Sequence, residues 1–184
     1  MKLRANLMNH EEINRALKRI SHQILERNQG AEQIVLLGIK RGGLPLAEIL
    51  SSNIQAIEGV AVPVGELDIT CYRDDRCPET TENSKPAEDT SRIPFGINGC
   101  HVILVDDVLY TGRTVRAALD AVSKYGRASS IQLAVLIDRG HRELPIRADY
   151  VGKNVPTSKS EQVEVHLEDG STKEVLLLGP EEQM

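Results

Sequence analysis

The chain has 184 residues, a formal net charge of −5 and a hydrophobic fraction of 40%. This length and apolar fraction suit a single globular domain, over residues 1–184, with a sizeable core. Because the net charge is negative, the protein does not bind nucleic acids through an overall positive charge. Any nucleic-acid binding needs a local basic patch. No apolar run could span a bilayer, and no signal-peptide core follows Met1. The three cysteines, Cys71, Cys77 and Cys100, do not have the spacing of a metal site, and their odd number does not suggest a disulfide framework. We therefore expect the protein to reside in the reducing cytoplasm.

The first half of the chain predicts a helix, a strand, a helix and a strand. Residues 10–28 are predicted to form an amphipathic helix that Asn9 caps. Its apolar positions at helical spacing are Ile13, Leu17, Ile20 and Ile24. A buried strand is expected at 34–37, a helix from the following Gly-Gly pair through about residue 57, and a strand at 60–69.

The second half continues the alternation of strands and helices. Short buried strands are predicted at 102–105 and 131–137, with a helix from about residue 115 between them. Such an alternating series implies a parallel sheet. Near the C-terminus, Val163–Leu167 and Val175–Leu178 flank an Asp-Gly pair, which predicts a β-hairpin.

Residues 102–114 are the most informative stretch of the chain. Val102 to Val105 form an apolar run that stops at Asp106 and Asp107. Unpaired charge is costly to bury, so we expect the two carboxylates to face a crevice at the carboxyl edge of the sheet, where ligands of open α/β sheets bind. A loop of small residues and a helix N-terminus follow, and their amides can cradle a phosphate. Carboxylates suit the hydroxyls of a ribose, so the stretch predicts a ribose 5-phosphate site.

A second predicted anion site is the segment Lys40-Arg41-Gly42-Gly43. It follows a strand and precedes a helix, as the first site does. A plain linker would need neither two cations nor two glycines, although a Gly-Gly pair alone is weak evidence.

Residues 102–114 resemble the phosphoribosyl-pyrophosphate (PRPP) signature of type I phosphoribosyltransferases. Neither of the commoner phosphate motifs, Gly-x-x-x-x-Gly-Lys-Ser/Thr or a helix-opening Gly-x-Gly-x-x-Gly, occurs in the chain. The resemblance implies an α/β fold with a central parallel sheet flanked by helices, a small hood and a C-terminal hairpin. It also implies that Asp106 and Asp107 hold the ribose hydroxyls and that PRPP carries Mg²⁺. The amides that would hold the 5′-phosphate belong to Val108, Leu109, Tyr110, Thr111, Gly112, Arg113 and Thr114.

The resemblance assigns the departing diphosphate to two further segments. The first is the segment Lys40, Arg41 and Gly42, which would face the diphosphate. Related sequences commonly have an arginine at the position of Gly42, so contacts to the diphosphate from side chains and from the main chain are both possible here. Residues of about 73–98 would form a mobile catalytic loop that closes over PRPP, brings Arg73 to the diphosphate and excludes water. From the residues alone, a surface insert with incidental charge fits this segment equally well.

Residues 138–163 form a basic segment after a core strand, and the resemblance makes them a hood over the base. Arg139 and the main chain near Val163 would then frame the base. The stretch 102–163, the N-terminal helix and the segment at 65–75 are together similar to a bacterial subfamily of uracil phosphoribosyltransferases that also regulate pyrimidine biosynthetic operons by transcription attenuation.

This resemblance implies two activities. The enzyme would convert uracil and PRPP to UMP and diphosphate, and the regulator would bind leader mRNA more tightly with UMP in the site. We also expect a homodimer or a larger homo-oligomer. The implied RNA-binding residues are Lys18, Arg19, His22, Arg142, Arg147 and Lys153.

Three alternatives stay open from the sequence. A purine or orotate phosphoribosyltransferase is disfavoured because purine enzymes of this fold usually stack the base on a hood aromatic residue, for which Tyr150 is the only candidate. An RNA-binding regulator without catalysis is opposed by the intact acid pair and Arg73. An enzyme without RNA binding is weakly opposed by the cations between Arg15 and Arg27.

Overall fold

The computed structural model describes residues 1–74, 88–168 and 171–180, and its main layer is a five-stranded sheet. The strand order is β3-β2-β4-β5-β6, and all four pairings are parallel. The predicted central parallel sheet is therefore confirmed. The strands are β2 (Ile34–Ile39), β3 (Val64–Leu67), β4 (His101–Leu109), β5 (Ser130–Asp138) and β6 (Tyr150–Asn154).

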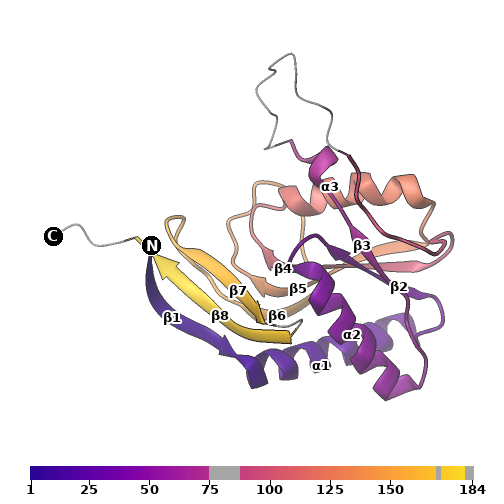
Figure 1. Cartoon of the computed structure of the whole chain (residues 1–184), viewed down its shortest axis with the longest axis horizontal. Coiled ribbons are helices and arrows are strands. Elements are labelled where there is room, and N and C mark those ends of the chain that lie inside the picture. Colours follow the sequence, from indigo (N-terminus) through magenta and orange to yellow (C-terminus); the bar gives the residue numbers. More distant parts are fainter. Residues whose placement is uncertain (75–87, 169–170, 181–184) are drawn as a thin grey trace, which may run out of the picture.

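Helices cover both faces of this sheet (Figure 1). α1 (His10–Asn28) and α2 (Gly43–Glu58) contribute to the apolar cluster on one face, and α3 (Arg113–Val122) to the cluster on the other. Strand β2 is buried at every position because both faces are covered. Short 3₁₀ turns are present at Thr70–Tyr72 and Ser123–Tyr125. Within the described residues, none of the helices combines the length and the apolar character that crossing a membrane requires.

Helix α1 has the predicted bounds and the predicted cap. The side chain of Asn9 accepts a hydrogen bond of 3.0 Å from the amide of Glu12, whose carboxylate accepts one of 2.9 Å from the amide of Asn9. This reciprocal pair is a capping box. The four predicted apolar positions are at most 1% exposed. Their burial turns the basic residues of the opposite face toward solvent.

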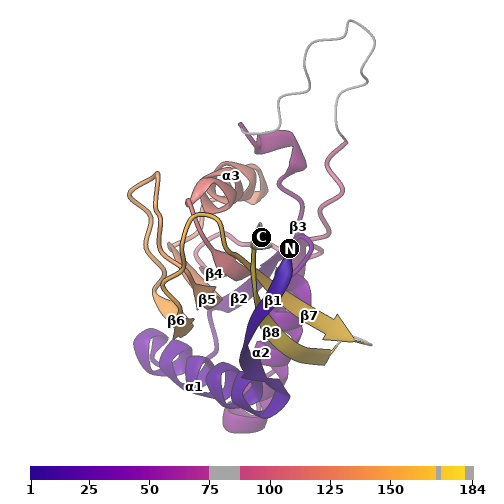
Figure 2. The ribbon, with the colours of Figure 1, turned by 90° about the vertical axis from the view of Figure 1, so that its left-hand side faces the viewer.

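A second, three-stranded sheet lies beside the first (Figures 1 and 2). Its strands are β1 (Lys2–Asn9), β7 (Gln162–Glu168) and β8 (Ser171–Gly179), in the antiparallel order β1-β8-β7. Strands β7 and β8 confirm the two arms of the predicted hairpin, and its Asp-Gly pair at 169–170 lies outside the described residues. Strand β1 was not predicted. Within the predicted hood, residues 150–154 form β6, an edge strand of the central sheet.

Strands β4 and β3 differ most from their predicted bounds, whereas β2 and β5 extend theirs by one or two residues at an end. Strand β4 continues past Val105, because Asp106 still pairs with Val135 and Leu109 with Asp138 of β5. The acid pair therefore lies within the strand and not in the loop after it. Strand β3 covers only Val64–Leu67 of the predicted 60–69.

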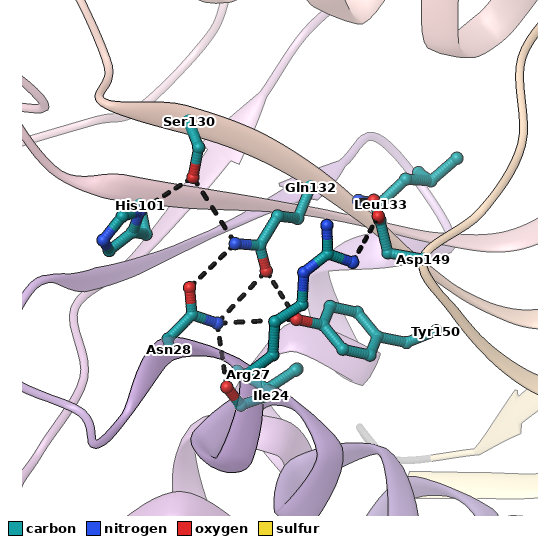
Figure 3. A network of polar contacts seen from close by, with 9 residues as sticks. All are labelled: Ile24, Arg27, Asn28, His101, Ser130, Gln132, Leu133, Asp149 and Tyr150. Atoms are coloured by element: carbon teal, nitrogen blue, oxygen red, sulfur yellow. Dashed lines mark hydrogen bonds and ion pairs between the residues drawn. The ribbon is translucent and has the colours of Figure 1, made fainter.

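A polar network fastens the C-terminal end of α1 to β5 and β6 (Figure 3). The side-chain amide of Gln132 donates to Asn28 over 2.7 Å, and its oxygen accepts from the Tyr150 hydroxyl over 2.5 Å. Arg27 and Asp149 form an ion pair of 2.5 Å beside it. Gln132 and Tyr150 are 6% and 3% exposed, so the network is a buried and satisfied polar cluster. It fixes α1 against the edge of the sheet that carries β6.

Candidate active site

Two cavities at the carboxyl edge of the central sheet share the side chain of Arg73. The first, which we call the basic cavity, has a volume of about 550 Å³. It is lined by Lys40, Arg41, Asp68, Ile69, Thr70, Arg73 and Thr90. The second, the loop cavity, has a volume of about 360 Å³. It is lined by Arg73, Asp106, Val108, Leu109, Tyr110, Thr111, Gly112, Arg113, Thr114 and Glu143.

The loop cavity contains the whole of the predicted PRPP loop. Gly112 is the N-cap of α3 and has a φ of 94°, a left-handed conformation that favours glycine. The loop therefore turns directly into the positive end of a helix dipole, which favours an anion. Thr111 Oγ1 accepts from the amide of Arg113 over 3.4 Å. A phosphate cradle would require this placement of the loop.

The two members of the acid pair, Asp106 and Asp107, differ in their surroundings. The crevice expected for the acid pair is present at Asp106, which lines the loop cavity and is 6% exposed, whereas Asp107 lines neither the loop cavity nor the basic cavity. Burial and the neighbouring charge of Asp107 raise the pKa of Asp106 well above its ordinary value, against the lowering influence of Arg73. Asp107 is half-buried, and its carboxylate accepts from the amide of Val108 over 2.7 Å.

The Lys40–Gly42 segment lies directly beside the acid pair. The peptide bond between Lys40 and Arg41 is cis, and both side chains line the basic cavity. A Cβ atom on Gly42 would lie 2.2 Å from Oδ2 of Asp107, so only glycine allows this approach. Gly42 therefore brings the two predicted anion sites into contact through its main chain and contributes no side chain to the basic cavity.

Arg73 lies between the two cavities. Its Nη1 is 3.5 Å from Oγ1 of Thr114 in the loop cavity. The next residue, Asp74, binds Arg113 over 3.1 Å and Arg116 over 2.9 Å. These contacts hold the beginning of the predicted catalytic loop against the start of α3. Residues 75–87 of that predicted loop lie outside the described residues.

The two predicted base-binding residues are buried and line neither cavity. Arg139 is 6% exposed, and its guanidinium carbon lies 4.0 Å from the ring centroid of Tyr110. It donates to Thr157 Oγ1 over 3.0 Å and to the main-chain oxygen of Glu161 over 2.7 Å. Val163 belongs to the core cluster on the α1 face. The side chain of Arg139 thus fixes the segment that leads into β7.

The predicted RNA-binding residues fall into two groups on either side of β6. Lys18 and His22 are exposed on α1, and Arg19 and Lys153 line a common cavity between α1 and β6. Arg19 Nη2 donates to the main-chain oxygen of Gly152 over 2.6 Å. Lys153 donates to that of Leu7 over 2.8 Å.

The second group consists of Arg142 and Arg147, which line another cavity together with Asn154. Successive residues of a strand point to opposite faces, so Lys153 and Asn154 direct the two groups to opposite sides of the sheet edge. Arg147 is exposed. Arg142 is half-buried, and it forms an ion pair of 2.5 Å with Asp138.

Sequence reasoning missed several residues of the two cavities. Asp68, Thr70 and Thr90 line the basic cavity, and Glu143 lines the loop cavity and binds Arg113 over 2.7 Å. Asp68 had a signal that could have revealed it, because it is an acid close to the carboxyl end of the predicted strand 60–69. Thr90 carried no such signal, since it reaches the site only through the tertiary fold.

Comparisons with known proteins agree with this architecture. Residues 4–170 match the phosphoribosyl transferase domain family. The fold is similar to that of hypoxanthine phosphoribosyltransferase from Trypanosoma cruzi, with a TM-score of 0.74 and 22% identity over 97% of this chain and 96% of the other. At this identity the likeness supports the fold alone.

Closer relatives carry the name bifunctional protein PyrR. The protein from Pelotomaculum thermopropionicum is 57% identical over 176 residues, which cover 95% of this chain and 96% of the relative. That from Deinococcus radiodurans is 53% identical over 97% of each chain. The chain therefore belongs to the phosphoribosyl transferase domain family and, within it, to the bifunctional PyrR proteins, the uracil phosphoribosyltransferases and pyrimidine-operon regulators that its sequence resembles.

Proposed function

We propose that the protein transfers ribose 5-phosphate from PRPP to N1 of uracil at the two cavities that share Arg73. The bond between C1′ and the diphosphate oxygen breaks, the bond between C1′ and N1 forms, and N1 loses its proton. The observation that carries the proposal is the arrangement of two cavities that meet at Arg73. Lys40 and Arg41 line one, and an acid with a helix N-terminus lines the other.

In this arrangement each cavity would take one half of PRPP. The main chain of residues 108–114 would hold the 5′-phosphate, and Asp106 and Asp107 the ribose hydroxyls. Lys40, Arg41 and Arg73 would stabilise charge that develops on the departing diphosphate, where preorganised cations have their greatest effect. The shared position of Arg73 would let its cation reach the departing diphosphate while it also contacts Thr114 of the loop that would hold the 5′-phosphate.

Mg²⁺ would enter with PRPP. The carboxylates of the acid pair are hard oxygen donors of the kind Mg²⁺ accepts, and diphosphate oxygens would supply its other ligands. When bound, the ion would neutralise part of the diphosphate charge. Among the described residues, no group of three or more His, Cys, Asp and Glu side chains could hold a metal ion. The protein's own residues would orient PRPP, and PRPP itself would supply most of the ligands of the ion.

The base would be uracil, held near Arg139 and the main chain at Val163. Arg139 would act by fixing the segment at Thr157–Glu161, since its guanidinium is already bound there. A purine or orotate as substrate is the alternative. The 57% identity to a PyrR protein favours uracil over the purine bases of the more distant structural neighbours.

The regulatory role would be binding of pyrimidine-operon leader mRNA, more tightly with UMP in the site. Cations on both sides of β6 would supply phosphate contacts, with Lys18, Arg19, His22 and Lys153 on one side and Arg142 and Arg147 on the other. Because the two groups lie on opposite sides of one sheet edge, a homodimer or larger homo-oligomer would offer a continuous surface by placing groups of two chains together.

The test is release of diphosphate from PRPP and Mg²⁺ with uracil, orotate, hypoxanthine or guanine as the acceptor. We expect turnover with uracil only, with UMP as the product. The Asp106→Asn, Asp107→Asn double variant should lose turnover, because charge-assisted hydrogen bonds worth about 1.5–3 kcal/mol each are removed. Turnover with a purine would contradict the base assignment, and full turnover in the double variant would contradict the site.

A further inference from the structure

Asp68 joins two separate segments at the wall of the basic cavity. It directly follows β3 and is 6% exposed. Its Oδ1 accepts hydrogen bonds from the amide of Thr70 over 2.9 Å and from the hydroxyl of that residue over 2.6 Å. Its Oδ2 accepts one from the hydroxyl of Thr90, and its amide donates to Oγ of Ser91 over 2.8 Å. One aspartate thus holds residues 70 and 90–91 side by side.

The same cluster fixes the side chain of Lys40. The ammonium group donates to Oγ1 of Thr90 over 2.8 Å and lies 4.0 Å from both Asp68 Oδ2 and Glu66 Oε1. A chain of hydrogen bonds therefore runs from Lys40 through Thr90 to Asp68. A lysine side chain is long and flexible, so this chain determines where its charge stands in the cavity.

The carboxylate keeps its charge in this position. Burial would raise the pKa of Asp68, but hydrogen bonds from Thr70 and Thr90 and the charge of Lys40 lower it to about 2. A permanent anion thus lies in the wall of a cavity that would receive a diphosphate. Like charges repel, so this carboxylate opposes diphosphate binding. Asp68 would thus weaken diphosphate binding by its own charge, while it holds the ammonium of Lys40, which favours binding. This combination indicates that Asp68 serves to position other groups.

We propose that Asp68 is a positioning residue for phosphoribosyl transfer. It holds the ammonium of Lys40 and the main chain from Thr70 to Arg73 in the positions at which they contact the departing diphosphate. Its negative charge at the same time lowers the affinity of the cavity for diphosphate. The inference rests on the proposed function of the basic cavity. It predicts opposite changes in two quantities when the charge of Asp68 is removed: kcat falls, and diphosphate binds as tightly as before or more tightly.

The experiment compares Asp68→Asn with the control Asp120→Asn. Asp120 is also an ion-paired carboxylate, since it lies 3.4 Å from Arg116, but it lines neither cavity. We measure kcat, KM for PRPP and, by calorimetry, Kd for diphosphate with Mg²⁺. Asp68→Asn should lower kcat by about tenfold to a hundredfold, the effect of losing a charge-assisted hydrogen bond, with KM and Kd unchanged or lower. Asp120→Asn should stay within about twofold of the wild type.

A second pair of variants keeps the inference testable where Asp68→Asn does not fold. Thr90 is exposed, so Thr90→Val should fold, and it removes the link between Lys40 and Asp68. It should lower kcat with little change in KM, and Thr90→Ser should restore kcat because it keeps the hydroxyl.

The possible outcomes separate the inference from the function on which it rests. An unchanged kcat in Asp68→Asn, or a raised KM or Kd, would overturn the positional role while the wild type remains an active enzyme. A wild type that releases no diphosphate with any base would refute the proposed function itself.

Discussion

The guanidinium of Arg142 donates a 2.7 Å hydrogen bond to the main-chain oxygen of Tyr110, and so joins the basic segment after β5 to the predicted PRPP loop. The amides of Glu143 and Leu144 reinforce this contact by donating to the main-chain oxygen of Thr111 over 3.0 and 3.2 Å. Loop and segment therefore form one hydrogen-bonded unit. A nucleotide phosphate that orders the loop would also order the segment that carries Arg147.

This unit predicts that Arg142 couples the nucleotide to RNA. We expect Arg142→Gln to reduce the factor by which UMP tightens leader-RNA binding, because the charge-assisted bonds to the loop and to Asp138 are weakened. Couplings of this kind are commonly about 5- to 150-fold. Gel shifts with and without UMP measure the factor.

Arg147→Gln is the matched control for this prediction. Its side chain is exposed, so its loss should lower RNA affinity by a similar factor with and without UMP. If Arg142→Gln behaves in the same way as Arg147→Gln, Arg142 is an ordinary RNA contact and the coupling does not pass through it.

The buried acid Asp106 predicts a pH-dependent gain in stability when it is replaced. Burial and Asp107 raise its pKa in the folded state. A raised pKa means that the group favours the fold while protonated, at pH values below its ordinary pKa, and that this contribution is lost as the pH rises through the folded-state pKa. Asp106→Asn should therefore raise the Tm of the ligand-free protein, and the gain should grow with pH.

Thermal unfolding between pH 5 and pH 8.5 measures this gain. Asp120→Asn, at an exposed residue of α3, is the control and should show no such trend. A Tm of Asp106→Asn below that of the wild type at pH 8 would mean that the ionised carboxylate stabilises the free protein.

Much of the fold could be predicted because its strongest signals are local. The capped helix 10–28 and the buried strands β2 and β5 follow from spacing and burial on both faces. Strand β1 could not be predicted, because its pairing with β8 joins Lys2 to Gly179 and has two irregularities in register. Strand β6 contains Gly152 and two polar residues, so its short sequence has no apolar pattern.

The candidate site likewise has parts that could be predicted from neighbouring residues and parts that depend on the tertiary fold. The acid pair and the loop at 108–114 stand together in the sequence, and their proximity needed no knowledge of the fold. The contact between Gly42 and Asp107 and the link from Thr90 to Lys40 join residues far apart in the chain. Such contacts depend on which strands are neighbours, and a single sequence does not specify that order.

Arg73→Ala should damage turnover more than binding of PRPP. The cation lines both cavities, and in the proposed reaction charge would develop beside it as the bond to diphosphate breaks. We expect kcat and kcat/KM to fall together in steady-state kinetics with uracil. A rise in KM alone would make Arg73 a ground-state binding residue. Arg116→Ala, which removes a partner of Asp74 outside the cavities, should have a much smaller effect.

Charge reversal at two cations of α1, Lys18 and Arg19, should have different effects on the Tm. Lys18 is exposed, so Lys18→Glu should leave the Tm unchanged. Arg19 binds the main-chain oxygens of Val151 and Gly152 on β6, so Arg19→Glu places an anion beside two carbonyls and should also lower the Tm.

Both variants should lose leader-RNA binding while their uracil phosphoribosyltransferase activity stays within a few-fold of the wild type. Each lost phosphate contact should reduce the log–log slope of affinity against salt by about 0.7 for single-stranded RNA. Titrations of RNA at several salt concentrations, with Tm and activity measured on the same preparations, test this. RNA affinity in Lys18→Glu equal to that of the wild type would remove Lys18 from the RNA surface, whereas loss of activity in Arg19→Glu would show that its contacts with β6 also support the active site.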